Sequence, residues 1–158
     1  MSVSEIVRET TVAGTSASEV KVDRKIKVNG VALSAFRIVV AFLFLCHSVQ
    51  GLAGAFGGID GNGAAVEFGS WPGWWGSLIE LVGGVLVLLG LFTRPAAVLL
   101  SGVMAYAYFT VHQSIGLLPI QNLGEPAALY SWIFLLIAVL GSGTFALDTV
   151  RRARSGRS

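Results

Sequence analysis

Four long apolar stretches dominate the chain after residue 30. They cover residues 31–49, 74–93, 95–113 and 126–147. Each has about 19–22 residues, and a helix of that length, rising about 1.5 Å per residue, covers the roughly 30 Å of a bilayer's hydrocarbon core. The pattern predicts an all-α integral membrane protein whose four helices form a bundle.

The connections between these stretches differ in length and composition. The segment "FTRPA" joins the second stretch to the third in a tight hairpin broken by Pro95. A glycine-rich connection, "GLAGAFGGIDGNG" followed by "AAVEFGSWPGWW", joins the first to the second. Within it we expect one short interfacial helix at residues 64–68. Tryptophans at its end are typical of the aromatic belt at a membrane surface: Trp71, Trp74 and Trp75.

The first 30 residues differ from the rest of the chain. They are rich in Ser, Thr and Val with mixed charges, and they lack the apolar core of a signal peptide. This composition predicts a disordered tail at residues 1–30. The predicted organisation is this tail, a membrane domain at residues 31–148 and a basic tail at residues 149–158.

Composition agrees with a lipid environment. Hydrophobic residues make up 54% of the chain and charged residues 13%, with a mean hydropathy of +0.73. The charged share is about half that of a typical soluble domain. Cys46 is the single cysteine, so an internal disulfide or a CxxC pair cannot form. Transfer of electrons from paired cysteines to quinone is therefore excluded.

The basic residues predict the orientation. All eleven Lys and Arg residues lie in the two terminal segments, just inside the first stretch, or in the short hairpin. The connections at residues 50–73 and 114–125 contain none. The positive-inside rule then places both termini in the cytoplasm of a multi-pass membrane protein. The basic C-terminus would contact anionic lipid, and we expect no nucleic-acid partner.

Polar side chains gather near the outer ends of the four stretches in this topology. We take them as candidates for a ligand pocket on the extracytoplasmic side: His47, Glu80, Tyr108, His112, Gln113, Asn122 and Glu125. The two histidines also fit ordinary positions at a membrane interface, and Glu125 also fits a helix cap at the positive end of the fourth helix dipole.

Glu80 is the most unusual of these residues. It shares a helical face with Gly83 and Gly84, and small residues allow close helix packing in lipid. We therefore expect Glu80 to point inward, into a polar pocket roofed by the glycine-rich connection. Because an intramembrane carboxylate needs a partner, we expect His47 or His112 to lie within hydrogen-bond distance of it, directly or through one water.

Three other charged residues fit structural or topological roles. Arg37 lies about 15 Å to the cytoplasmic side of His47 along a helix. We expect it to pair with Asp148 or to extend its guanidinium to lipid phosphates. Arg94 lies in the short hairpin.

Three segments resemble the DoxX family of small bacterial membrane proteins. They are "AFRIVVAFLFLCHSVQGL", "IELVGGVLVLLGLFTRPAA" and "NLGEPAALYSWIFLLIAVLGSGTFALD", and the resemblance covers residues 35–148. It implies a four-helix integral protein of the bacterial plasma membrane. The polar family positions would be Arg37, Glu80, Arg94, Asn122, Glu125, Tyr130 and Asp148. Ser48 stands where the family usually has glycine.

The resemblance also bears on function. Some relatives are linked to quinone-dependent thiosulfate oxidation, and others to sulfur metabolism and oxidative stress as membrane partners of soluble enzymes. One hypothesis is a redox-linked membrane subunit that binds quinone and works with a soluble or membrane redox enzyme. The alternative is a non-catalytic membrane anchor or assembly partner.

Haem and metal sites are less favoured hypotheses. A haem would be held by His47 and His112, and a metal by the two histidines with Glu80 and Glu125. Transport of a small solute stays open. Catalytic residues, enzymatic activity and oligomeric state are not assigned from the sequence.

Overall fold

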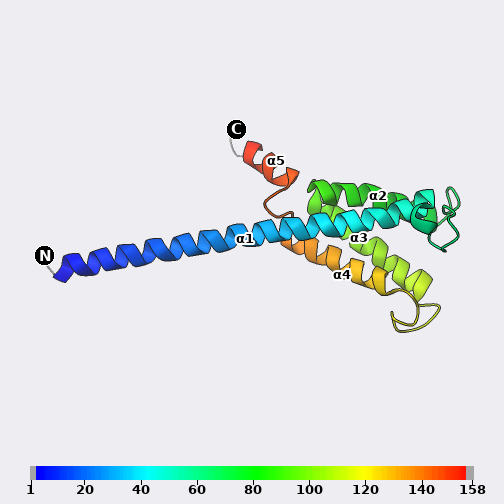
Figure 1. Cartoon of the computed structure of the whole chain (residues 1–158), viewed down its shortest axis with the longest axis horizontal. Helices are drawn as coiled ribbons and strands as arrows, with labels where there is room; N and C mark the ends of the chain where they lie inside the picture. Colours follow the sequence, from blue (N-terminus) through cyan, green and yellow to red (C-terminus); the bar gives the residue numbers. More distant parts are fainter. Residues whose placement is uncertain (1–2, 156–158) are drawn as a thin grey trace.

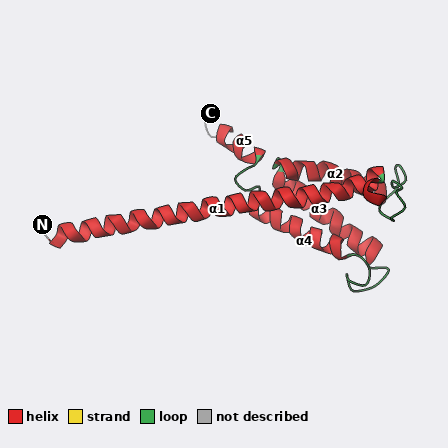
Figure 2. Cartoon of the chain, in the orientation of Figure 1, coloured by secondary structure: helices red, strands yellow, loops and turns green. Residues whose placement is uncertain are grey.

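The computed structural model describes residues 3–155 and, in its first helix, side chains from residue 22 onward. The described part is helical and contains no strand, as Figure 2 shows. Its elements are α1 (Val3–Ala53), the 3₁₀ turn η1 (Ala55–Gly57), α2 (Gly73–Leu89), α3 (Thr93–Ala107), the π-helical turn η2 (Tyr108–His112), α4 (Glu125–Leu140) and α5 (Leu147–Ser155). The predicted all-α class is confirmed.

A helix lies at each of the four apolar stretches. By length and hydropathy, two segments of the described chain could cross a membrane: Val22–Ala53, with a mean hydropathy of 2.1, and Thr93–His112, with 1.3. The apolar helices α2 and α4 are shorter, with 17 and 16 residues. Helix α4 ends earlier than predicted because Gly141 and Gly143 adopt positive φ angles, which turn the chain out of the helix.

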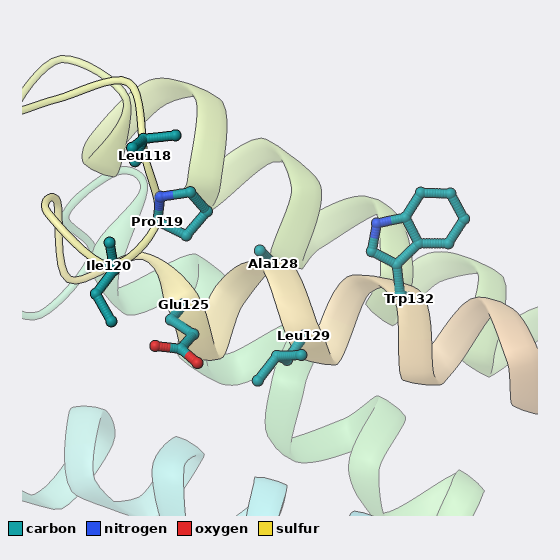
Figure 3. A pocket seen from close by; sticks show the side chains of 7 residues that line it. All are labelled: Leu118, Pro119, Ile120, Glu125, Ala128, Leu129 and Trp132. Atoms are coloured by element: carbon teal, nitrogen blue, oxygen red, sulfur yellow. The ribbon is translucent and has the colours of Figure 1, made fainter.

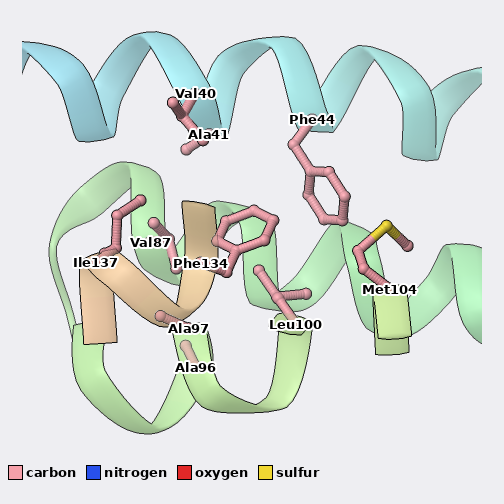
Figure 4. Packing of buried hydrophobic residues seen from close by; sticks show 10 residues of the cluster. All are labelled: Val40, Ala41, Phe44, Val87, Ala96, Ala97, Leu100, Met104, Phe134 and Ile137. Atoms are coloured by element: carbon pink, nitrogen blue, oxygen red, sulfur yellow. The ribbon is translucent and has the colours of Figure 1, made fainter. Parts of the chain in front are cut away.

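The four helices share one hydrophobic core (Figure 4). Phe44 of α1 and Phe134 of α4 meet edge to face, with ring centroids 4.7 Å apart, the geometry that aromatic quadrupoles favour. The buried apolar side chains are Val40, Ala41 and Phe44 from α1, Val87 from α2, Ala96, Ala97, Leu100 and Met104 from α3, and Phe134 and Ile137 from α4.

The glycine face of α2 packs inward, as predicted. Gly83 faces the side chain of Leu100 on α3, and Gly84 faces Leu45 on α1. Both glycines are buried, and so is Glu80 on the same face. Small residues at this position let α2 approach its two neighbours closely.

Helix α1 begins far earlier than the sequence predicted. It is continuous from Val3, so residues 3–30 are helical where we predicted disorder. Its N-terminal half projects away from the bundle (Figure 1), and residues 22–29 are all exposed. No proline interrupts residues 3–53, and the pair of Lys27 with Asp23 one turn apart, at 3.4 Å, is the local kind of contact that supports an isolated helix.

The predicted interfacial helix at residues 64–68 is wrong. These residues form an irregular loop, and the local helical turn is η1. The backbone N–H of Val66 donates to the carbonyl of Gly51 at 2.8 Å, and that of Ala64 donates to Asn62 Oδ1 at 2.8 Å. These bonds fold the loop onto the end of α1 and replace the i to i−4 bonds of a helix.

Candidate functional site

Arg37 binds the ends of two helices at the base of the bundle. Its side chain is 1% exposed. The guanidinium donates to the carbonyls of Val87 and Leu88 at the end of α2, the latter at 2.6 Å. It also donates to Ser142 at 3.0 Å and Phe145 at 2.6 Å, in the turn after α4. Arg37 thus supplies a donor to carbonyls at the end of α2, where intrahelical donors run out, and to carbonyls in the turn after α4.

The expected direct ion pair between Arg37 and Asp148 is therefore wrong, although the charge of Asp148 acts on Arg37 from a longer distance. Asp148 instead caps the start of α3: Oδ1 accepts the N–H of Phe92, and Oδ2 accepts both the N–H and the hydroxyl of Thr93, each at 2.9 Å. Burial alone would raise the pKa of Asp148, but the bonds from Thr93 and Phe92 and the charge of Arg152 outweigh it and lower that pKa below its ordinary value. Arg94 is exposed beside this cap.

Small residues allow the turn after α4 to cross α1. The N–H of Thr144 donates to the carbonyl of Gly30 at 3.1 Å, and that of Phe145 donates to Ser34 Oγ at 2.9 Å. Gly30, Ser34 and Arg37 follow one another at helical spacing, so they form one docking face. Our sequence reasoning missed this contact, although the small-residue spacing was a signal for it.

Glu80 is inward, as expected, but has no histidine partner. The residue is 6% exposed, and its Oε2 atom has no hydrogen-bond partner. His47 is exposed at the outer end of α1, and Nδ1 of His112 lies 3.0 Å from the carbonyl of Asn122. The expected direct hydrogen bond between Glu80 and a histidine is therefore wrong, because His47 is exposed and His112 meets the carbonyl of Asn122 instead.

Several of the other candidates organise the connection at residues 113–124. Asn122 is fully buried; its Nδ2 donates to the carbonyl of Gly116 and its Oδ1 accepts the N–H of Gly124, each at 2.8 Å. Tyr108 donates its hydroxyl to the carbonyl of Leu117 at 3.2 Å, and Gln113 is exposed at the end of η2. These bonds, with that of His112, hold the connection against the ends of η2 and α4.

An open groove lies between this connection and the outer half of α4 (Figure 3). Glu125 is the one charged residue lining it, and its volume is about 380 Å³. Glu125 and Trp132 are both exposed, Trp132 by 72%. The lining residues are Leu118, Pro119, Ile120, Glu125, Ala128, Leu129 and Trp132. The predicted candidates thus separate into two places, with Glu125 at this groove and Glu80 in the bundle.

A metal ion is not supported by the arrangement of the candidates. Between residues 22 and 155, no three His, Cys, Asp or Glu side chains are grouped closely enough to hold one. The arrangement of two histidines and two glutamates that the sequence left open is therefore not formed.

Over residues 3–155 the fold is all-helical with an apolar exterior, and two of its helices are long and apolar enough to cross a membrane. The chain belongs to the DoxX family, whose family model matches residues 32–113; this family is membrane-associated. It is similar to a protein of Haemophilus influenzae named "Uncharacterized protein", with 43% identity over 120 residues, which cover 73% of this chain and 87% of that protein. No solved structure matches the chain.

Proposed function

We propose that all four helices cross the membrane and that both termini are cytoplasmic. Support comes from the outer surface of the bundle, where large apolar side chains are exposed on every helix, such as Phe42, Val82, Val98 and Val139. A soluble monomer rarely exposes so much contiguous apolar surface. Helices α2 and α4 are about 24–26 Å long, short enough to require some local thinning of the bilayer.

A reporter fusion tests the orientation. In Figure 1 the two long connections lie at one end of the bundle, and the N-terminal half of α1 and α5 extend from the other. A fusion at the exposed Gly61 is expected to give an external signal, and a fusion after Arg157 a cytoplasmic one. A cytoplasmic signal at Gly61 contradicts the proposed topology.

Within this topology, we propose that the protein is a redox-linked subunit that binds quinone. The observation that carries this proposal is the groove beside α4, which continues into an exposed apolar stripe formed by Leu129, Trp132 and Leu136. A lipid-soluble ring can enter such a groove from the bilayer, and apolar walls with one polar group are typical of small-molecule sites.

The groove residues suit a quinone ring and its reduced form. The indole of Trp132 offers an aromatic surface for the ring. The carboxylate of Glu125 can accept a hydrogen bond from a quinol hydroxyl, and in its protonated form can donate to a quinone carbonyl. The electrons would be exchanged with a soluble or membrane redox enzyme bound to this subunit.

Titration of the purified protein with a short-chain ubiquinone, followed by Trp fluorescence quenching, tests this proposal. Trp132→Ala and Glu125→Gln are expected to weaken binding about tenfold or more, equivalent to about 1.4 kcal/mol. Because Trp132→Ala removes the nearby fluorophore, its affinity is measured by equilibrium dialysis. Trp75→Ala is the matched control, since this exposed indole lies outside the groove. A wild-type protein that binds no quinone contradicts the proposal, and so does equal loss in the control.

The alternative of a non-catalytic anchor or assembly partner also has an observation in its favour. Three of the candidate pocket residues form hydrogen bonds that hold the connection at residues 113–124: Tyr108, His112 and Asn122. Their polar atoms thus stabilise the fold, as a protein without a ligand pocket would need. Co-purification of a partner enzyme with a chain that binds no quinone would favour this alternative.

A further inference from the structure

A buried carboxylate without a partner lies inside the bundle, away from the groove residues. Glu80 is only 6% exposed, and no hydrogen bond reaches its Oε2 atom. Within the described chain, no ion pair reaches it either. An ionised carboxylate in this position would carry an uncompensated charge in an apolar medium, which costs far more than the neutral acid.

The surroundings of Glu80 supply no countercharge. The ionisable side chains on the bundle part of α1 are Arg37, Cys46 and His47, and those on α3 are Arg94 and Tyr106. Arg37 bonds the carbonyls of Val87 and Leu88, about 10 Å further along α2 than Glu80. His47 and Arg94 are exposed. The neutral acid is therefore the form that this site favours.

A seam of small side chains leads from Glu80 to the outer end of the bundle. Ser77 lies one helical turn before Glu80 on the same buried face of α2, with Cβ atoms about 5–6 Å apart at this spacing. Its hydroxyl lies directly against Gly51 of α1, where a side chain would collide with it. Gly51 is followed within a few residues by the glycine-rich connection that covers this end of the bundle.

We propose that Glu80 is a proton-binding site in the bundle core and that it exchanges its proton with the outer surface through Ser77 and the seam between α1 and α2. The ligand is a proton carried by water, because the packing of Ser77 and Ile59 against Gly51 leaves room for nothing larger. A buried polar atom that has no protein partner is a place where ordered water is expected. This inference does not depend on quinone binding in the groove.

Infrared spectroscopy of the full chain in lipid vesicles at pH 7 tests the proposal. The carbonyl stretch of a protonated carboxylic acid is separate from the amide bands, and exposed carboxylates at this pH do not contribute to it. We expect one such band, its downshift in D₂O, and its loss in Glu80→Gln. Glu67→Gln is the matched control and is expected to retain the band, because Glu67 is exposed in the glycine-rich connection and lies outside the groove.

The proposed path of the proton through Ser77 is tested separately, by the rate at which the carbonyl band shifts after transfer into D₂O. Ser77→Ala is expected to keep the band and to slow its shift, since the hydroxyl that relays the proton is gone. A wild-type spectrum without the band, a band that persists in Glu80→Gln, or a band that never shifts in D₂O overturns the site. An unchanged rate in Ser77→Ala overturns the route through this residue. Glu80→Gln is near-isosteric, and its folding is checked by monodispersity in detergent.

Discussion

Replacement of Arg37 by leucine is expected to abolish most of the folded protein. The substitution removes the donor from the carbonyls of Leu88, Ser142 and Phe145, and leaves that of Val87 with only the N–H of Gly90. Each buried carbonyl without a partner costs about 1–3 kcal/mol. For three such carbonyls the total is more than about 3 kcal/mol, a large part of the whole stability of many domains.

The controls for this prediction use the same end of the bundle. Arg94→Leu removes an exposed arginine and is expected to change stability by less than about 0.5 kcal/mol. Arg37→Lys keeps the charge but cannot reach four carbonyls with one ammonium group, so an intermediate loss is expected. Thermal unfolding and monodispersity in detergent are the measurements. Equal stability of Arg37→Leu and Arg94→Leu would contradict the bridging role of Arg37.

Gly143→Ala is expected to give the second large loss of stability. Gly143 crosses α1 so closely that a Cβ atom there would lie 2.8 Å from both the carbonyl oxygen of Gly30 and the backbone nitrogen of Ser34. Real Cβ atoms do not approach backbone so closely, so α1 and the turn after α4 would have to separate. Overpacking of this kind costs about 1–3 kcal/mol.

Gly69→Ala is a matched control because it shares the backbone strain but not the collision. The φ angles of Gly69 and Gly143 are +76° and +75°, so an alanine at either position carries a similar conformational penalty. A Cβ atom at Gly69 would meet nothing within 4 Å. The difference between the two variants in unfolding temperature therefore measures the close approach alone. If the two variants unfold at the same temperature, α1 and this turn are not packed as described.

The sequence was least informative about where polar side chains lie. Glu80 and Glu125 were assigned to one pocket because their depths along the predicted helices agree. Depth follows from counting residues, but direction depends on how each helix is rotated in the bundle. The rotation buries Glu80 against the seam and leaves Glu125 exposed beside the groove.

Arg37 illustrates the same difficulty over a longer range. Two of its acceptors, Ser142 and Phe145, are 105 and 108 residues away in sequence. They are backbone carbonyls, which every residue possesses, so no residue type marks them. A carboxylate such as Asp148 was the natural partner to expect from the sequence. The structure uses that carboxylate to cap α3 instead.

The sequence by itself determined the positions of the four apolar helices, their apolar exterior and the inward glycine face of α2. These follow from local patterns, because apolar run length, helical spacing and small residues act within a few turns. Only the tertiary structure decided the partners of Arg37 and Asp148, the isolation of Glu80 and the position of the groove. Each of these depends on how separate helices rotate and cross, and that geometry is set by the packing of all four helices together.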